Sequence, residues 1–83
     1  MNQLMLYMVL AGDMLLAKKR KASREIRVQM EQLLTAWQQL LQGSNNYGSG
    51  LNKAHDILDF NNQAEKVLME NIAFNASKHL GVI

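Results

Sequence analysis

Apolar residues recur along the chain at helical spacing, and the spacing is most regular in the middle of the sequence. They follow one another at steps of four, three, four and three residues, in the order Ile26, Met30, Leu33, Trp37 and Leu40. This is the a and d pattern of helices that pack against neighbouring helices. We therefore expect a helix over about residues 23–42, with Trp37 as its most buried side chain.

A helix is also expected before it, over about residues 2–17. Its apolar stripe steps by four and three residues and consists of Leu4, Met8, Ala11 and Leu15. Further apolar residues flank that stripe, namely Met1, Met5, Val9 and Leu16. The width of this apolar surface predicts a helix that is buried on more than one side. Gly12 lies within it and costs about 1 kcal/mol relative to Ala.

A third helix is expected over about residues 51–78. Its inner stripe again steps by three and four residues, through Ile57, Phe60, Ala64, Val67, Asn71 and Phe74. The last residues, 75–83, contain Gly81 and are expected to fray. The core of the whole chain is then predicted to contain Ile26, Met30, Leu33, Trp37, Leu40, Phe60 and Val67.

Two stretches interrupt the helical pattern. Residues 18–22 separate the first two helices, and Ser23 after them is suited to cap the second helix through its hydroxyl. Residues 43–50 contain three Gly, two Ser and two Asn, which are strong helix breakers. Strand-like alternation is missing from the sequence, so the expected fold class is all-α, with residues 1–83 as one unit. The three segments form either an antiparallel bundle, which the glycines favour, or a partly continuous helical rod.

The composition excludes several kinds of catalytic and metal site. The 83 residues include no Cys and no Pro, and 48% of them are hydrophobic. Without Cys the chain has no disulfide, no thiolate nucleophile and no Cys-ligated zinc. His55 and Asp56 are adjacent and Asp59 follows one turn later, but a third convergent ligand is not spaced to join them. We therefore expect ordinary surface residues there, no cofactor, and a protein that is not an enzyme.

Basic residues are concentrated in one place. Six of the nine Lys and Arg residues lie within ten positions, and they are Lys18, Lys19, Arg20, Lys21, Arg24 and Arg27. Such a cluster fits contact with a polyanion, either nucleic acid or an anionic membrane surface, and it also fits a solvated loop between helices. Aromatic residues for base stacking are missing from it, which disfavours nucleic acid. The uncharged run Leu4–Gly12 is too short to span a bilayer.

The residues around Trp37 resemble a spectrin repeat. Repeats of that family build their third helix around a Trp, with a preceding Ala-Ser and an Ile and Leu at heptad steps, as Ala22, Ser23, Ile26, Leu33, Trp37 and Leu40 stand here. The family places further residues in the helix that follows, at positions matched by Leu51, Ala54, Phe60, Ala64, Glu65 and Val67. The resemblance covers about residues 11–68. It implies a fragment straddling two repeats, from the end of one second helix through a third helix to the next first helix.

The chain departs from that family in two respects. Members continue the third helix into the next first helix, whereas residues 43–50 here should break or bend it. A Trp expected near Glu70 is also missing. The resemblance implies a cytoplasmic, cytoskeleton-associated structural module that binds other helical segments or its own copies. The alternative is a small basic helical protein that binds nucleic acid or an anionic membrane surface through residues 18–27.

Overall fold

The computed structural model describes residues 2–42 and 50–81, with side chains described from residue 53 onward in the second range. Three α-helices follow one another: α1 (Gln3–Lys18), α2 (Arg24–Leu41) and α3 (Gly50–His79). A short 3₁₀ helix, η1 (Lys19–Lys21), joins α1 to α2. The described residues contain no strand, so the expected all-α class is confirmed.

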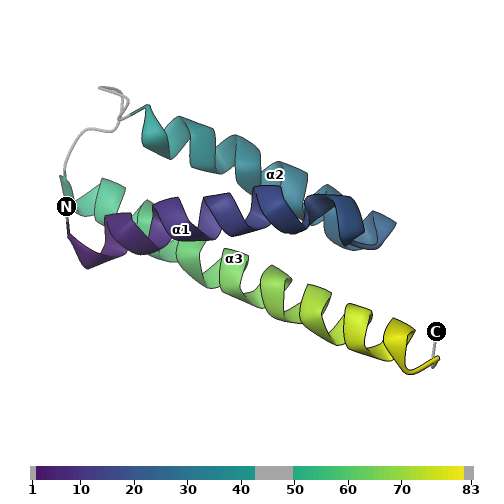
Figure 1. The fold of residues 1–83 in the computed structure, drawn as a ribbon. Coiled ribbons are helices and arrows are strands. Elements are labelled where there is room, and N and C mark those ends of the chain that lie inside the picture. Colours follow the sequence, from purple (N-terminus) through teal and green to yellow (C-terminus); the bar gives the residue numbers. More distant parts are fainter. Residues whose placement is uncertain (1, 43–49, 82–83) are drawn as a thin grey trace.

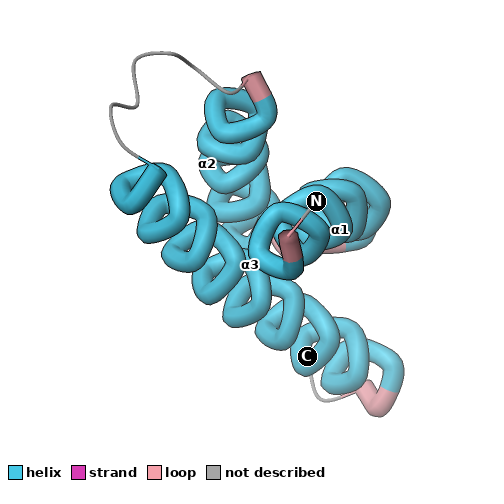
Figure 2. Tube along the Cα trace, turned by 90° about the vertical axis from the view of Figure 1, so that its left-hand side faces the viewer, coloured by secondary structure: helices cyan, strands magenta, loops and turns pink. Residues whose placement is uncertain are grey.

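The helices form an antiparallel bundle. The chain runs along α1, turns back along α2 and returns along α3, so α1 and α3 point the same way (Figure 1). Each helix contacts both others, and the turned view shows them as three sides of one bundle (Figure 2). Because α2 and α3 lie side by side as separate helices, the chain adopts the bundle and not the rod. Of the stretch expected to bend, residues 43–50, the first seven residues lie outside the described part of the chain.

One helix is much longer than the others. The 30 residues of α3 span about 45 Å at 1.5 Å per residue, which nearly matches the 48 Å long axis of the molecule. The expectation that residues 75–83 fray is wrong for the first five of them. They are helical because the backbone ladder continues, with Leu80 N donating to the Ala76 carbonyl at 3.0 Å. Gly81 then takes a positive φ of 79°, which glycine adopts without strain.

Two side chains fix where helices begin. The Ser23 hydroxyl accepts a hydrogen bond from the Ile26 N–H at 3.3 Å, and the Asn2 carboxamide oxygen accepts one from the Met5 N–H at 2.9 Å. Each satisfies an N–H group that lacks a partner within its helix. Ala22 and Ser23 have an extended backbone, so α2 begins at Arg24 as a helix separate from α1.

Seven residues of the apolar stripes on α2 and α3 lie in the core. Ile26, Met30, Leu33, Trp37, Leu40, Phe60 and Val67 are buried. They are joined by residues of all three helices and of the turn before α2, namely Met8, Leu15, Ala22, Leu34, Ile57 and Ala64.

The sequence led us to expect that Trp37 is the most buried side chain of α2, and this is wrong. It retains 9% of its exposure, whereas Met30 retains none. A wide indole seldom loses all contact with solvent in a bundle this small. Its ring lies against Gly12 of α1, so closely that a Cβ on Gly12 would overlap the ring. The glycine therefore lets α1 approach the indole.

The first helix buries only part of the wide apolar surface that the sequence predicts. Met5 and Val9, beside the core stripe, are half-buried against the core. Met8, Gly12 and Leu15 face the core, but Leu16 remains 49% exposed. The reason is that α1 has just two neighbouring helices in the described structure. Other large apolar side chains of α1 are therefore also left at the surface, namely Leu6, Tyr7, Leu10 and Met14.

Candidate functional site

An apolar groove runs along the surface between α1 and α3. It has a volume of about 620 Å³. One wall comes from α1 and consists of Leu4, Tyr7, Leu10, Ala11 and Met14. The other comes from α3 and consists of Leu58, Asn61, Asn62, Glu65, Leu68, Met69 and Ile72. Two parallel helices thus form an open channel with mostly apolar walls.

Each wall is a second heptad stripe beside the core stripe of its helix. On α1 the stripe passes through Tyr7, Leu10 and Met14 at steps of three and four residues. On α3 it steps by four and three residues through Leu58, Asn62, Glu65, Met69 and Ile72. The sequence predicts an inner stripe and flanking apolar residues for the first helix, but spacing within one helix does not show that two such flanks face each other across a groove. The wall residues repeat the same steps one or two positions away from the core stripes.

The groove residues are unusually exposed for their type. Met69 and Ile72 each retain 59% of their exposure, and Tyr7 retains 55%. Scattered apolar side chains on a protein surface are ordinary, but a contiguous set rimmed by polar groups marks an interaction surface. Six of the large exposed apolar side chains gather here, from both walls: Tyr7, Leu10, Met14, Leu58, Met69 and Ile72.

A hydrogen bond ties the two walls together near the start of α1. The Asn61 side-chain amide donates to the Leu4 carbonyl at 3.1 Å. The carboxamide oxygen of Asn61 is buried and finds no partner among the described residues. This bond holds α3 against the first turn of α1 and keeps that end of the groove in shape.

At its other end the groove continues into a smaller depression of about 190 Å³. The two share Met14, Leu68 and Ile72, and the depression adds Lys18, Asn71 and Asn75. Asn71 is only 2% exposed, and its carboxamide oxygen has no hydrogen-bond partner in the described part of the chain. The apolar channel therefore ends at a buried amide and a lysine.

The predicted polyanion-binding residues gather at this same end of the bundle, around the α1–α2 corner (Figure 1). Five of them are exposed, namely Lys18, Arg20, Lys21, Arg24 and Arg27, and Lys19 is half-buried. The Arg27 guanidinium donates to the Ala22 carbonyl at 3.4 Å, which leans it back over the turn. The cluster is thus a charged corner beside the groove, and we call it the basic corner.

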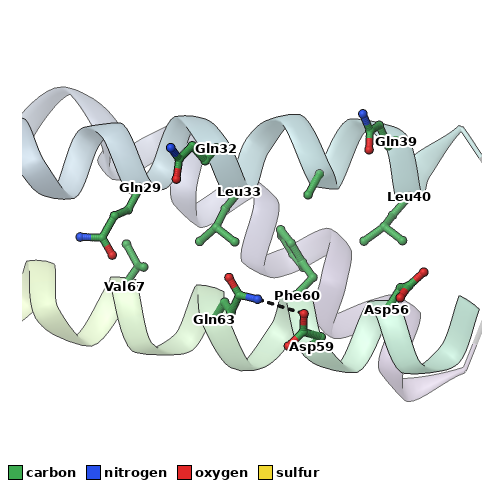
Figure 3. Close-up of a pocket in the computed structure, with 11 residues that line it drawn as sticks. Gln29, Gln32, Leu33, Gln39, Leu40, Asp56, Asp59, Phe60, Gln63 and Val67 are labelled. Carbon is green, nitrogen blue, oxygen red and sulfur yellow. Dashed lines mark hydrogen bonds between the residues drawn. The ribbon is translucent and has the colours of Figure 1, made fainter. Parts of the chain in front are cut away.

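A second, more polar hollow of about 340 Å³ lies between α2 and α3. Figure 3 shows Leu33, Leu40, Phe60 and Val67 in the seam between the two helices, with polar side chains along it. Four glutamines and two acids line it, namely Gln29, Gln32, Gln39, Gln63, Asp56 and Asp59. The Gln63 amide donates to the Asp59 carboxylate at 3.0 Å. The described lining offers amides and carboxylates, which can hydrogen-bond, but no hydroxyl, imidazole or amine that could act as a nucleophile or be activated as one.

The residues considered for metal chemistry do not converge. Asp56 and Asp59 line the α2–α3 hollow, whereas the side chain of His55 is exposed and is not part of its lining. Within the ranges 2–42 and 50–81, no three His, Asp or Glu side chains are grouped so as to hold a metal ion. Among the helices that the structure describes, none is long and apolar enough to cross a membrane.

Comparison with known proteins gives no relative. No protein-family model, no curated protein and no solved structure matches this chain. The likeness to spectrin repeats therefore stands on the residues and spacing of about positions 11–68 alone.

Proposed function

We propose that this protein is a non-catalytic helix-association module, and that the groove between α1 and α3 is the seat for one further helix. The observation that carries the proposal is the pair of exposed heptad stripes that form the groove walls. Neighbouring stripes at steps of three and four residues are what a helix needs to insert its own side chains between them. A fourth helix laid there would complete a four-helix bundle.

The expected strength of this association follows from the exposed groove side chains. Full burial of one large apolar side chain is worth about 1.5–3 kcal/mol. Six such side chains in the groove are each about half exposed, so each contributes on the order of 1 kcal/mol when covered. The total must offset the loss of translational and side-chain freedom on binding. A single helix should therefore bind reversibly, with an affinity that small changes in the groove can alter.

For the cellular setting we propose the cytoplasmic cytoskeleton or membrane skeleton. The support is the resemblance to spectrin repeats, in which modules built around such a Trp associate through helices. The arrangement of α2 and α3 differs from that of the family. Here α3 folds back beside α2, whereas that family runs the corresponding helices into one rod. We therefore propose a compact module that binds a helix, in place of a segment of a continuous rod.

Calorimetric titration with a synthetic helix tests the docking site. The probe is a peptide matched to the 16 residues of α1, with Leu at the a and d positions and Ala and Gln elsewhere. The wild-type chain should bind it, and Leu10→Gln combined with Met69→Gln should weaken binding about tenfold through lost apolar contact. Val28→Gln is the control, because Val28 is similarly exposed, at 49%, but lies on α2. Equal binding by the groove variant and the wild type would exclude the groove as the docking site.

A second candidate function uses the basic corner directly. The exposure of Arg20, Lys21 and Arg24 supports contact of their positive charges with a polyanion. Such binding would be independent of sequence and strongly salt-dependent. A mobility shift on duplex DNA at low and high salt tests it, and absence of binding at low salt would eliminate this candidate.

A further inference from the structure

We propose that the helix accepted by the groove belongs to a different protein and carries acidic residues at the end that lies beside Lys18. This inference rests on the proposed function, and it adds which kind of helix the groove selects. It follows from two features of the described residues: the charge at the Lys18 end of the groove and the shape of the groove.

The charge is unequal along the groove. Lys18 lines the end of the groove that lies where α1 ends, and the rest of the basic corner follows it directly in the chain. The acid in the described groove lining is Glu65, which lies partway along the α3 wall. Charges within about 10 Å interact at physiological salt. A docked helix therefore ends within reach of several positive charges, and carboxylates there would bind more tightly and associate faster.

A second copy of the chain fits this charge pattern poorly. Docked antiparallel, it would bring its basic corner to the amino-terminal ends of α1 and α3. Neither described helix has an acid in its first turn, and helix amino termini carry partial positive charge. The acids near the start of α3, Asp56 and Asp59, line the hollow on the α2 side and not the groove. Docked parallel, it would place two basic corners next to each other. Both arrangements oppose like charges, whereas an acidic helix from another protein does not.

The shape of the groove favours a helix over a lipid surface. Its apolar side chains face each other across a channel, with Leu10 and Met14 on one wall and Met69 and Ile72 on the other. A membrane surface is contacted by the outward face of an amphipathic helix, not by a channel between two helices.

Three peptides with the same apolar stripe test the inference. One is the neutral Ala and Gln peptide, and the other two carry three Glu in the first turn or in the last turn. At about 50 mM salt, one of the acidic peptides should bind the wild-type chain about tenfold more tightly than the neutral peptide. At about 500 mM salt the advantage should fall below about threefold. Lys18→Glu combined with Lys19→Glu should remove it, and Lys66→Glu, outside the groove lining on α3, should leave it.

The other outcomes separate this inference from the proposed function. Equal binding of all three peptides would overturn the acidic preference and leave helix docking intact. Absence of binding by every peptide would overturn both. A dimer in light scattering that Leu10→Gln with Met69→Gln dissociates would assign the groove to a second copy. Binding to vesicles of anionic phospholipid that the same groove variant abolishes, with no peptide bound, would assign it to a membrane surface.

Discussion

The approach of α1 to α2 depends on one residue pair. The indole of Trp37 lies where the side chain of residue 12 would be, and Gly12 is buried beneath it. A glycine inside a helix is normally unfavourable by about 1 kcal/mol relative to alanine. Here that cost is offset by the contact of a large aromatic ring with the α1 backbone. The pair therefore determines how near α1 and α2 come to each other.

Gly12→Ala should consequently destabilise the protein although it improves helix propensity. The added methyl group must displace the Trp37 ring, and overpacking of this kind costs about 1–3 kcal/mol. Urea denaturation followed by circular dichroism measures the change. In a Trp37→Leu background, which removes most of the ring, Gly12→Ala should cost much less or stabilise. A stabilising effect of Gly12→Ala in the wild-type chain would show that the ring does not lie against α1.

Asn71 provides a second test at the same scale. Its side chain is buried and its oxygen has no partner among the described residues, which costs about 1–3 kcal/mol of folding free energy. Asn71→Leu keeps the branched shape and the number of side-chain heavy atoms and removes the unpartnered oxygen, so it should raise the stability of the free chain by about 1–2 kcal/mol in thermal denaturation. Asn62→Leu, at an exposed position of the same helix, should change that stability little. A loss of stability in Asn71→Leu would mean that the amide is satisfied in solution.

At the scale of single helices, the start of α2 was predictable because its cause is local. A serine followed by an acid and then an apolar stripe is a helix start, and the Ser23 hydroxyl indeed bonds to the Ile26 N–H. The core stripe from Ile26 to Leu40 was predictable for the same reason, since the spacing of residues within one helix fixes which share a face.

Ser23→Ala should therefore cost about 0.5–2 kcal/mol of folding free energy, through the loss of the cap. Ser77→Ala, in the last turn of α3 and away from any helix start, is the control and should have an effect near zero or slightly favourable, because alanine is the better helix former. The two variants can be compared in chemical denaturation at equal protein concentration. If they unfold at the same urea concentration, the Ser23 hydroxyl does not stabilise α2.

Features that depend on contact between helices could not be read from the spacing. The role of Gly12 arises from Trp37, which is distant in sequence. The exposure of Leu10, Met14 and Leu16 arises because α1 has two neighbours and cannot bury a wide apolar face. The groove itself depends on α3 folding back alongside α1, which a periodic pattern does not specify. Helix ends and core stripes were thus accessible from sequence, and the candidate site was not.

The whole molecule is short and thick compared with a continuous helix. Its Cα radius of gyration is 14.1 Å and its extents are 48 × 20 × 16 Å. A single helix of this many residues would be about 125 Å long, with a radius of gyration above about 30 Å. Small-angle scattering of the monomer should give a value within a few ångströms of the compact one, and a value near that of the rod would contradict the bundle.

The central claim is that the α1–α3 groove seats a helix, and methionine methyl groups report on it directly. Met14 and Met69 line the groove, whereas Met8 and Met30 are completely buried in the core. The most direct measurement is a methyl NMR titration of the ¹³C-methionine-labelled chain with the neutral amphipathic peptide. Our account predicts saturable shifts of the Met14 and Met69 signals, with those of Met8 and Met30 nearly unchanged. Saturable shifts confined to the core signals, or none for Met14 and Met69 at full occupancy, would contradict it.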